Sequence, residues 1–186
     1  MLNKILYLLI ISMICSVLNI LPSRANLQIV KLSYLNDGTK NITASSVVNT
    51  SPEIVWKVIT DYSNFTRFMP GVKKFNIIRD EKIKKLVDVK LNLSCFSDPF
   101  EYQAFITEDV NNKTVVMIRK SGDFNYLKIV YNLVPTDNGA KTIVKYSLLI
   151  NHEKGVPNII VDNILKGNTS KTINAIKKES LSRKSK

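Results

Sequence analysis

Side chains that could act as acids, bases or nucleophiles are few and scattered in this chain. It holds one histidine, His152, and two cysteines, Cys15 and Cys95. A general base needs a partner within hydrogen-bond reach, and a single thiol with no histidine near it in the sequence is more often a small buried apolar side chain than a nucleophile. We therefore predict no catalytic residue, and we expect His152 to lie at a strand end or on the surface.

The sequence also lacks patterns that hold a metal or a cofactor. It contains no glycine-rich phosphate loop, no metal-ligand spacing and no nucleophile elbow. Cys15 lies in the N-terminal segment, so the remainder of the chain can form no internal disulfide. Asp61 and Tyr62 end a predicted helix, where we expect them to make hydrogen bonds instead of doing chemistry. We predict neither a cofactor nor a bound metal.

Basic residues outnumber acidic ones by 27 to 15, which gives a formal net charge of +12. Such a bias favours anionic partners, although a lysine-rich solvated surface is the alternative. The cations are spread along the chain without a recognised motif, so we expect no nucleic-acid partner. A basic tail at residues 181–186, with Lys177 and Lys178 before it, is a candidate for transient docking on an anionic membrane. The alternative is a basic end, from Lys177 to Lys186, that is exposed and frays.

The first 25 residues resemble a signal peptide. Lys4 precedes an apolar run from Ile5 to Leu21, and Ser23 and Ala25 suit a signal-peptidase site before Asn26. A run of this length is at the short end of a membrane span, so an uncleaved anchor is the alternative. We predict an exported protein, periplasmic or secreted, or one anchored by this segment. Residues 26–180 then form one domain.

Hydrophobic periodicity in this domain predicts many strands around two short helices. Runs at 28–35 and 40–48, joined by Asn36-Asp37-Gly38, predict a hairpin. Residues 50–59 and 61–68 have helical patterns, and Thr50 and Glu53 have the spacing of a capping box. Six further segments are typical of strands: 72–79, 83–94, 100–107, 114–119, 126–134 and 142–151.

A long helix is predicted at the C-terminal end. Six apolar residues recur there at helical spacing, up to about Glu179: Ile160, Val161, Ile164, Leu165, Ile173 and Ile176. A meander of strands with one apolar face needs a cover, and this helix can supply it. The predicted fold class is therefore α+β.

Two stretches resemble a known superfamily. The segment 52–62, with Phe65 and the Phe-Met-Pro-Gly-Val of 68–72, is similar to the opening of the START-like polyketide cyclase/dehydrase and coenzyme-Q-binding superfamily (SRPBCC). The turn at 121–124 and the strand at 128–135 also fit, although Tyr131 stands where many relatives have tryptophan. The resemblance covers about residues 28–180. It implies the helix-grip fold: a curved antiparallel sheet of about seven strands wrapped on a long C-terminal helix, with two short helices after the first core strand.

What the resemblance implies about function is an apolar cavity between the sheet and the last helix. In relatives such a cavity holds lipids, isoprenoid quinones, sterols or polyketides. We favour binding or transport of a hydrophobic small molecule by a monomer. Two alternatives stay open: a cyclase or dehydratase acting on a polyketide-like substrate, and a membrane- or protein-interaction module with a closed core.

The candidate ligand-binding residues are inward-facing strand residues, residues at the cavity mouth and residues of the covering helix. For each of them, simple core packing is the alternative, and an error of one residue in register would exchange the two faces of a strand. The candidates are Leu91, Tyr102, Met117, Tyr131, Tyr146 and Leu148 on strands, Phe65, Phe68 and Met69 at the mouth, and Ile160, Ile164 and Leu165 on the helix.

Overall fold

The computed structural model describes residues 28–81, 83–93, 98–151 and 157–185. The predicted signal peptide, Cys95 and His152 lie outside these residues, so what the sequence predicts for them stays a prediction.

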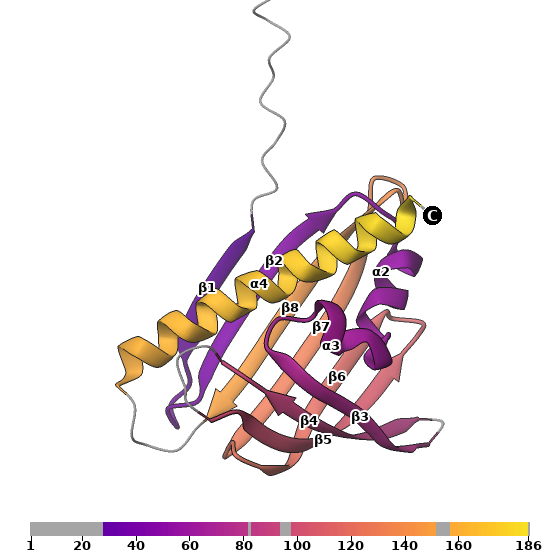
Figure 1. The fold of residues 1–186 in the computed structure, drawn as a ribbon. Coiled ribbons are helices and arrows are strands. Elements are labelled where there is room, and N and C mark those ends of the chain that lie inside the picture. The colour runs from indigo at the N-terminus through magenta and orange to yellow at the C-terminus, as the bar shows by residue number, and fades with distance from the viewer. Residues whose placement is uncertain (1–27, 82, 94–97, 152–156, 186) are drawn as a thin grey trace, which may run out of the picture.

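The described residues form one antiparallel sheet of eight strands in the order β1-β2-β8-β7-β6-β5-β4-β3 (Figure 1). The helix-grip prediction is confirmed. The sheet has eight strands instead of the expected number of about seven strands, because both strands of the N-terminal hairpin join it and β1 forms one edge. The strands are β1 (Ile29–Tyr34), β2 (Lys40–Val48), β3 (Val72–Asp80), β4 (Lys84–Leu91), β5 (Phe100–Asp109), β6 (Thr114–Gly122), β7 (Tyr126–Thr136) and β8 (Lys141–Asn151).

The two short helices lie between β2 and β3, as predicted. They are α2 (Pro52–Ile59) and α3 (Phe65–Phe68), with a 3-10 turn, η1 (Tyr62–Asn64), between them. Pro52 occupies the first turn of α2, but Ser51 and not Thr50 is the N-cap residue. The predicted capping box is therefore wrong, and Ser51 makes no side-chain capping hydrogen bond. Thr50 lies between β2 and α2, where its carbonyl oxygen accepts a hydrogen bond from the Thr142 hydroxyl at 2.7 Å.

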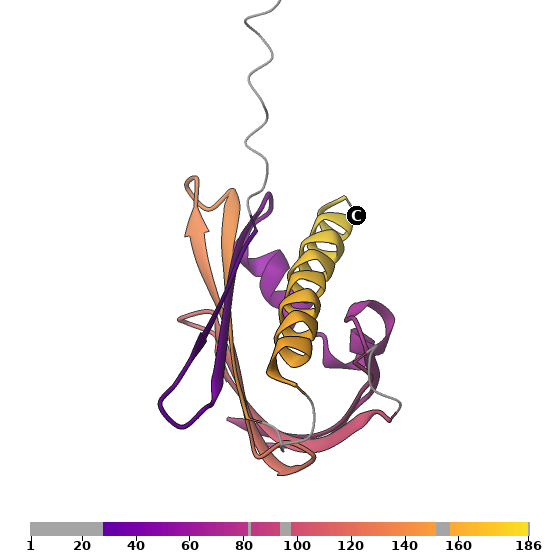
Figure 2. The same cartoon turned by 90° about the vertical axis from the view of Figure 1, so that its left-hand side faces the viewer.

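The long helix α4 (Asn158–Lys184) covers the concave face of the sheet. Figure 2 shows the sheet curving around this helix, and α4 contacts β1, β2, α2 and α3. The helix extends to Lys184, so the expectation that the basic end frays from Lys177 onward is wrong for residues 177–184. Arg183 and Lys184 hold intrachain partners there: Lys184 Nζ donates to the Asn49 carbonyl oxygen at 2.9 Å.

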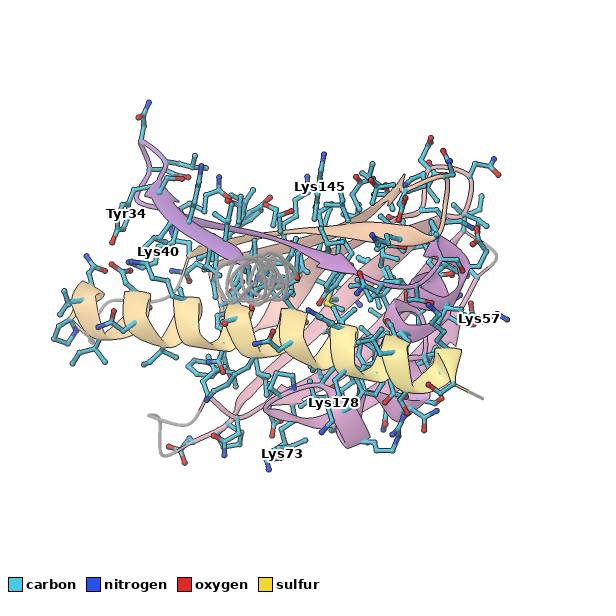
Figure 3. All side chains as sticks on the ribbon, turned by 90° about the horizontal axis from the view of Figure 1, so that it is seen from above. Tyr34, Lys40, Lys57, Lys73, Lys145 and Lys178 are labelled. Carbon is cyan, nitrogen blue, oxygen red and sulfur yellow. The ribbon has the colours of Figure 1, made fainter. Side chains whose placement is uncertain are left out.

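Polar contacts fix both ends of α4. At its start, Lys40 Nζ lies 2.8 Å from Asp162 Oδ1 and 3.0 Å from Asn158 Oδ1, while the Tyr34 hydroxyl donates to Asp162 Oδ2. The cation also lies over the Tyr34 ring, 4.7 Å from its centroid. Figure 3 shows Tyr34 and Lys40 beside the first turns of the helix.

At the other end, Arg183 lies 2.5 Å from Asp61 Oδ2 and 2.9 Å from Glu179 Oε1. Asp61 also accepts hydrogen bonds from Asn64, and the Tyr62 hydroxyl donates to Glu108 at 3.0 Å. The prediction that Asp61 and Tyr62 make hydrogen bonds is confirmed, although α2 ends at Ile59 and the two residues begin η1 instead of ending the helix. Polar contacts therefore hold both ends of α4 against the rest of the domain.

Two glycines allow close approaches that shape the concave face. Gly71 and Gly122 have φ of 76° and 109°, a region that disfavours other residues. A Cβ at Gly71 would collide with the Asn92 carbonyl oxygen, and one at Gly122 with the backbone of Glu101 and Tyr102. These turns therefore determine where β4 and β5 run, and with them the position of Tyr102.

Candidate ligand-binding site

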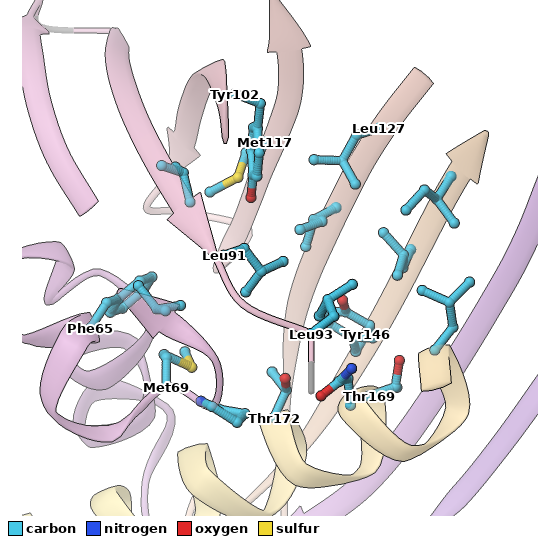
Figure 4. Close-up of a pocket in the computed structure, with 18 of the residues that line it drawn as sticks. Phe65, Met69, Leu91, Leu93, Tyr102, Met117, Leu127, Tyr146, Thr169 and Thr172 are labelled. Atoms are coloured by element: carbon cyan, nitrogen blue, oxygen red, sulfur yellow. The ribbon is translucent and has the colours of Figure 1, made fainter. Parts of the chain in front are cut away.

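An apolar pocket of about 110 Å³ lies between the concave face of the sheet and α4 (Figure 4). Strands β3 to β8 supply most of its wall, α3 and the residues around it supply one side, and one face of α4 closes it. The lining residues are Phe65, Met69, Pro70, Val72, Phe75, Val89, Leu91, Leu93, Tyr102, Met117, Phe124, Leu127, Ile129, Tyr131, Tyr146, Leu148, Ile150, Leu165, Asn168, Thr169 and Thr172.

Most of the residues predicted from sequence meet in this pocket. Those that line it are Phe65, Met69, Leu91, Tyr102, Met117, Tyr131, Tyr146, Leu148 and Leu165. They come from five strands, from α3 and its C-terminal end, and from α4. Their spatial grouping agrees with the prediction, and contact with a ligand remains a prediction.

Phe68, Ile160 and Ile164 do not line the pocket. The Phe68 ring packs edge-on against Phe65, with centroids 5.6 Å apart. Ile160 is 46% exposed, while its neighbour Val161 is buried. One helical residue turns the side chain by about 100°. The inward face of α4 therefore runs through Val161, Leu165 and Thr169, and Ile160 and Ile164 are turned away from the centre of that face.

Three polar residues of α4 were missed by the sequence analysis. Asn168, Thr169 and Thr172 line the pocket, and Thr169 is only 2% exposed. The search for apolar side chains at helical spacing passed over them. A signal was present, because Leu165, Thr169 and Thr172 stand at the i, i+4, i+7 spacing of one helix face. Other missed lining residues lie in line with predicted ones: Val89 and Leu93 with Leu91, Leu127 and Ile129 with Tyr131, and Ile150 with Leu148. Pro70, Val72, Phe75 and Phe124 were also missed.

Three tyrosines are the principal polar feature of the sheet side of the pocket. Tyr102, Tyr131 and Tyr146 project from β5, β7 and β8 and are less than 10% exposed. The rings of Tyr131 and Tyr146 lie 5.1 Å apart at a tilt of 55°. No described residue makes a hydrogen bond with any of the three hydroxyls. The pocket therefore combines an apolar wall with phenol groups that can bond to a guest.

Comparisons with known proteins agree with this geometry. Residues 48–177 match the family described as polyketide cyclase / dehydrase and lipid transport. The chain belongs to this family. The resemblance in the sequence is thereby confirmed, and the match spans the pocket-lining strands and most of α4. No curated protein matches the chain at a significant level.

Solved structures from this superfamily share the fold at low sequence identity. The Zhui aromatase/cyclase from Streptomyces sp. R1128 superposes with a TM-score of 0.69 at 11% identity, covering 78% of this chain and 95% of that one. A START superfamily protein from Mycobacterium smegmatis has a TM-score of 0.67 at 12% identity, covering 78% of this chain and 99% of that one. Human STARD10 has a TM-score of 0.65 at 10% identity, covering 86% of this chain and 83% of that one. These likenesses establish the fold alone.

The three tyrosines of the pocket all have raised pKa values. Burial raises the pKa of Tyr102, Tyr131 and Tyr146, and the neighbouring phenols raise the pKa of Tyr131 and Tyr146 further. Each hydroxyl is then protonated at neutral pH and able to donate a hydrogen bond. Acid–base catalysis typically uses titratable groups whose pKa values are driven apart. Here all three shift in the same direction.

Among the residues that the structure describes, no three His, Cys, Asp or Glu side chains come close enough to hold a metal ion. Within the same residues, no helix has the length and apolar character needed to cross a membrane.

Proposed function

We propose that this protein binds a hydrophobic small molecule that carries a hydrogen-bonding oxygen. The observation that carries the proposal is the group of three buried tyrosines in an otherwise apolar pocket. A carbonyl or hydroxyl oxygen on a guest would accept hydrogen bonds from the phenols, while its apolar part contacts Leu91, Met117 and Leu148. Membership of a family that includes lipid transport supports this role.

The size of the pocket limits what it holds in this conformation. An apolar cavity of about 150 Å³ accommodates benzene, so a pocket of about 110 Å³ suits a single ring or the polar end of a longer molecule. A whole lipid or isoprenoid quinone would require α4 to move away from the sheet. Such a movement would have to release the Lys40–Asp162 contact at the start of the helix.

A cyclase is the second candidate, because three titratable groups converge inside the pocket. The raised pKa of each phenol makes it a poor base and a poor acid near neutral pH. The phenols can hold and orient a carbonyl oxygen without moving a proton. Binding is therefore favoured over catalysis. The pocket also counts against the third alternative, an interaction module with a closed core.

A pair of probes tests the role of the tyrosines. Calorimetric titration with phenol and with benzene compares two single-ring guests that differ by one hydroxyl. We expect the wild-type protein to bind phenol about tenfold more tightly, since a net hydrogen bond contributes about 1–1.5 kcal/mol. Tyr146→Phe should remove most of that preference. Tyr126→Phe is the matched control, because Tyr126 is 40% exposed and does not line the pocket.

Equal binding of the two probes by the wild-type protein would overturn the assignment of the tyrosines. Native mass spectrometry with organic extraction, on protein purified from the cells that make it, then tests for a natural guest. Recovery of a stoichiometric apolar molecule with an oxygen group supports the proposal. The same spectrum reports the chain mass, and so tests the prediction of cleavage before Asn26.

A further inference from the structure

The charges of the sheet are divided between its two halves. Strands β1, β2, β6, β7 and β8 contain no aspartate or glutamate, although they carry several lysines. Strands β3 and β4 contain both signs and β5 contains only acidic residues, and the charges of these three strands pair with one another. Lys74 lies 2.6 Å from Asp88, and Lys90 lies 2.7 Å from Glu101. One half of the sheet is therefore neutralised within itself, and the other is basic.

The strand register gathers the basic half into a defined outer surface. Ala44 and Tyr146 face the interior, so alternation directs Thr43, Ser45 and Lys145 to the opposite face. Two rows of paired residues cross β1, β2, β8 and β7 there. They are Lys31, Thr43, Ser147 and Val130 in one row, and Ile29, Ser45, Lys145 and Asn132 in the next. We name these eight residues the outer groove.

The outer groove is an open depression of about 420 Å³, lined by all eight residues. Lys31 and Lys145 are exposed, and neither forms an ion pair with a described residue. Figure 3 shows Lys145 on the side of the sheet away from α4. Strand spacing separates the two lysine backbones laterally by about 10 Å, so both side chains can reach one anion. The hydroxyl groups of Thr43 and Ser45, on β2, lie between them.

Apolar side chains accompany the lysines on this face. Ile29 and Ile118 are 46% and 41% exposed, and Tyr126, at the start of β7, is 40% exposed. A surface of cations with interspersed apolar groups suits the boundary between lipid headgroups and acyl chains, where both kinds of side chain find partners. It is poorly suited to a second copy of the same face, because like charges would be opposed.

We propose that the outer groove and the strands around it dock on an anionic phospholipid bilayer, with a headgroup phosphate held between Lys31 and Lys145. This surface is on the opposite side of the sheet from the pocket and from α4. It is therefore distinct from the basic C-terminal tail. Docking through it does not depend on the pocket being occupied, so its test is independent of the ligand-binding proposal.

Vesicle co-sedimentation of the full chain tests this surface. Vesicles of phosphatidylcholine are compared with vesicles containing phosphatidylglycerol, and the difference in partitioning is measured. Binding through an apolar N-terminal run would contribute to both compositions and to every variant. Each lysine near an anionic surface contributes about fivefold to partitioning, so the double variant Lys31→Ala/Lys145→Ala should lose roughly 25-fold on anionic vesicles.

The matched control is Lys73→Ala/Lys178→Ala, which removes the same charge from exposed positions on the other side of the molecule (Figure 3). We expect it to lose less than about threefold, because distant charges are largely screened at physiological salt. Both variants should keep the wild-type melting temperature. Equal losses in the two variants would show that only net charge matters. A larger loss in the control would assign docking to the α4 side. Each of these two results overturns the proposal. The proposal is also overturned if the wild-type protein shows no preference for anionic vesicles.

Discussion

The interior beneath α4 has two ends of different character. Towards the C-terminal end of the helix, near α2, Ile173 and Ile176 belong to a fully buried aliphatic cluster with Val55 and Val58. Towards its N-terminal half, Leu165 and polar residues of the same helix face tyrosines and Met117 across a pocket. One end is filled, and the other is hollow. Burial of apolar side chains at the filled end stabilises the folded domain more than the hollow end does. This stability allows the domain to keep a pocket at its other end.

The largest expected effect is at the filled end. Ile176→Ala should lower the free energy of unfolding by about 3–4 kcal/mol, because it leaves a cavity in a fully packed region. Leu165→Ala should cost less, since Leu165 already borders empty space. Urea denaturation of both variants measures the difference. Equal losses would mean that the two ends are packed alike.

The contact that holds the hollow end of α4 should have the next largest effect. Lys40→Ala leaves the carboxylate of Asp162 without its cation in a site where the two side chains are only 5% and 14% exposed. Removing one partner of a buried pair costs about 3 kcal/mol or more. Lys141→Ala breaks an exposed pair with Asp137 and should cost less than about 1 kcal/mol. A similar cost for both variants would contradict the burial of the Lys40 contact.

Acid should weaken the same contact. Desolvation is the largest single effect on the pKa of Asp162 and raises it. The hydrogen bonds from Lys40 and Tyr34, together with the nearby lysine charges, outweigh desolvation, so the pKa is lowered. A carboxyl whose pKa is lower in the folded state stabilises the protein above its unfolded value of about 3.9. That contribution is lost as the pH falls through the folded pKa. The stability difference between wild type and Asp162→Asn should therefore shrink when urea denaturation is repeated below about pH 4. A difference that stays constant would exclude this linkage.

The smallest expected effect separates two kinds of buried tyrosine. Tyr62→Phe removes a hydroxyl that donates to Glu108 and should cost about 1–1.5 kcal/mol. Tyr131→Phe removes a hydroxyl with no described partner, so its effect on the melting temperature of the ligand-free protein should be near zero or slightly stabilising. A large loss in Tyr131→Phe would show that its hydroxyl serves the fold and not a guest.

Much of this organisation is encoded locally. Strict alternation through Val87, Val89 and Leu91 predicts both a strand and its inward face, because side chains alternate along an extended backbone. The sequence predicts turns at Gly71 and Gly122, where glycine separates predicted helices and strands. The close backbone contacts at both positions explain why glycine is required there. These features need only neighbouring residues, so a single sequence is enough to predict them.

The partners of residues far apart in the chain were decided only by the tertiary structure. Lys40 in a strand suggests exposure to solvent, yet it is buried against Asp162 from a distant helix. The rotation of α4 determines that Thr169 and Leu165 face the pocket while Ile160 does not. Apolar residues occur on more than one side of this helix, so its periodicity alone could not select the face.

By itself, the sequence determined the order of strands and helices and the alternation of strand faces, because these follow from short-range periodicity and turn chemistry, and its resemblance to a known superfamily implied the helix-grip fold. Only the tertiary structure turned the polar residues Asn168, Thr169 and Thr172 of α4 towards the pocket and placed the lysines of β1 and β8 on one outer surface. The physical reason is that register between strands and the rotation of a covering helix depend on long-range packing. Local patterns constrain these features but do not specify them.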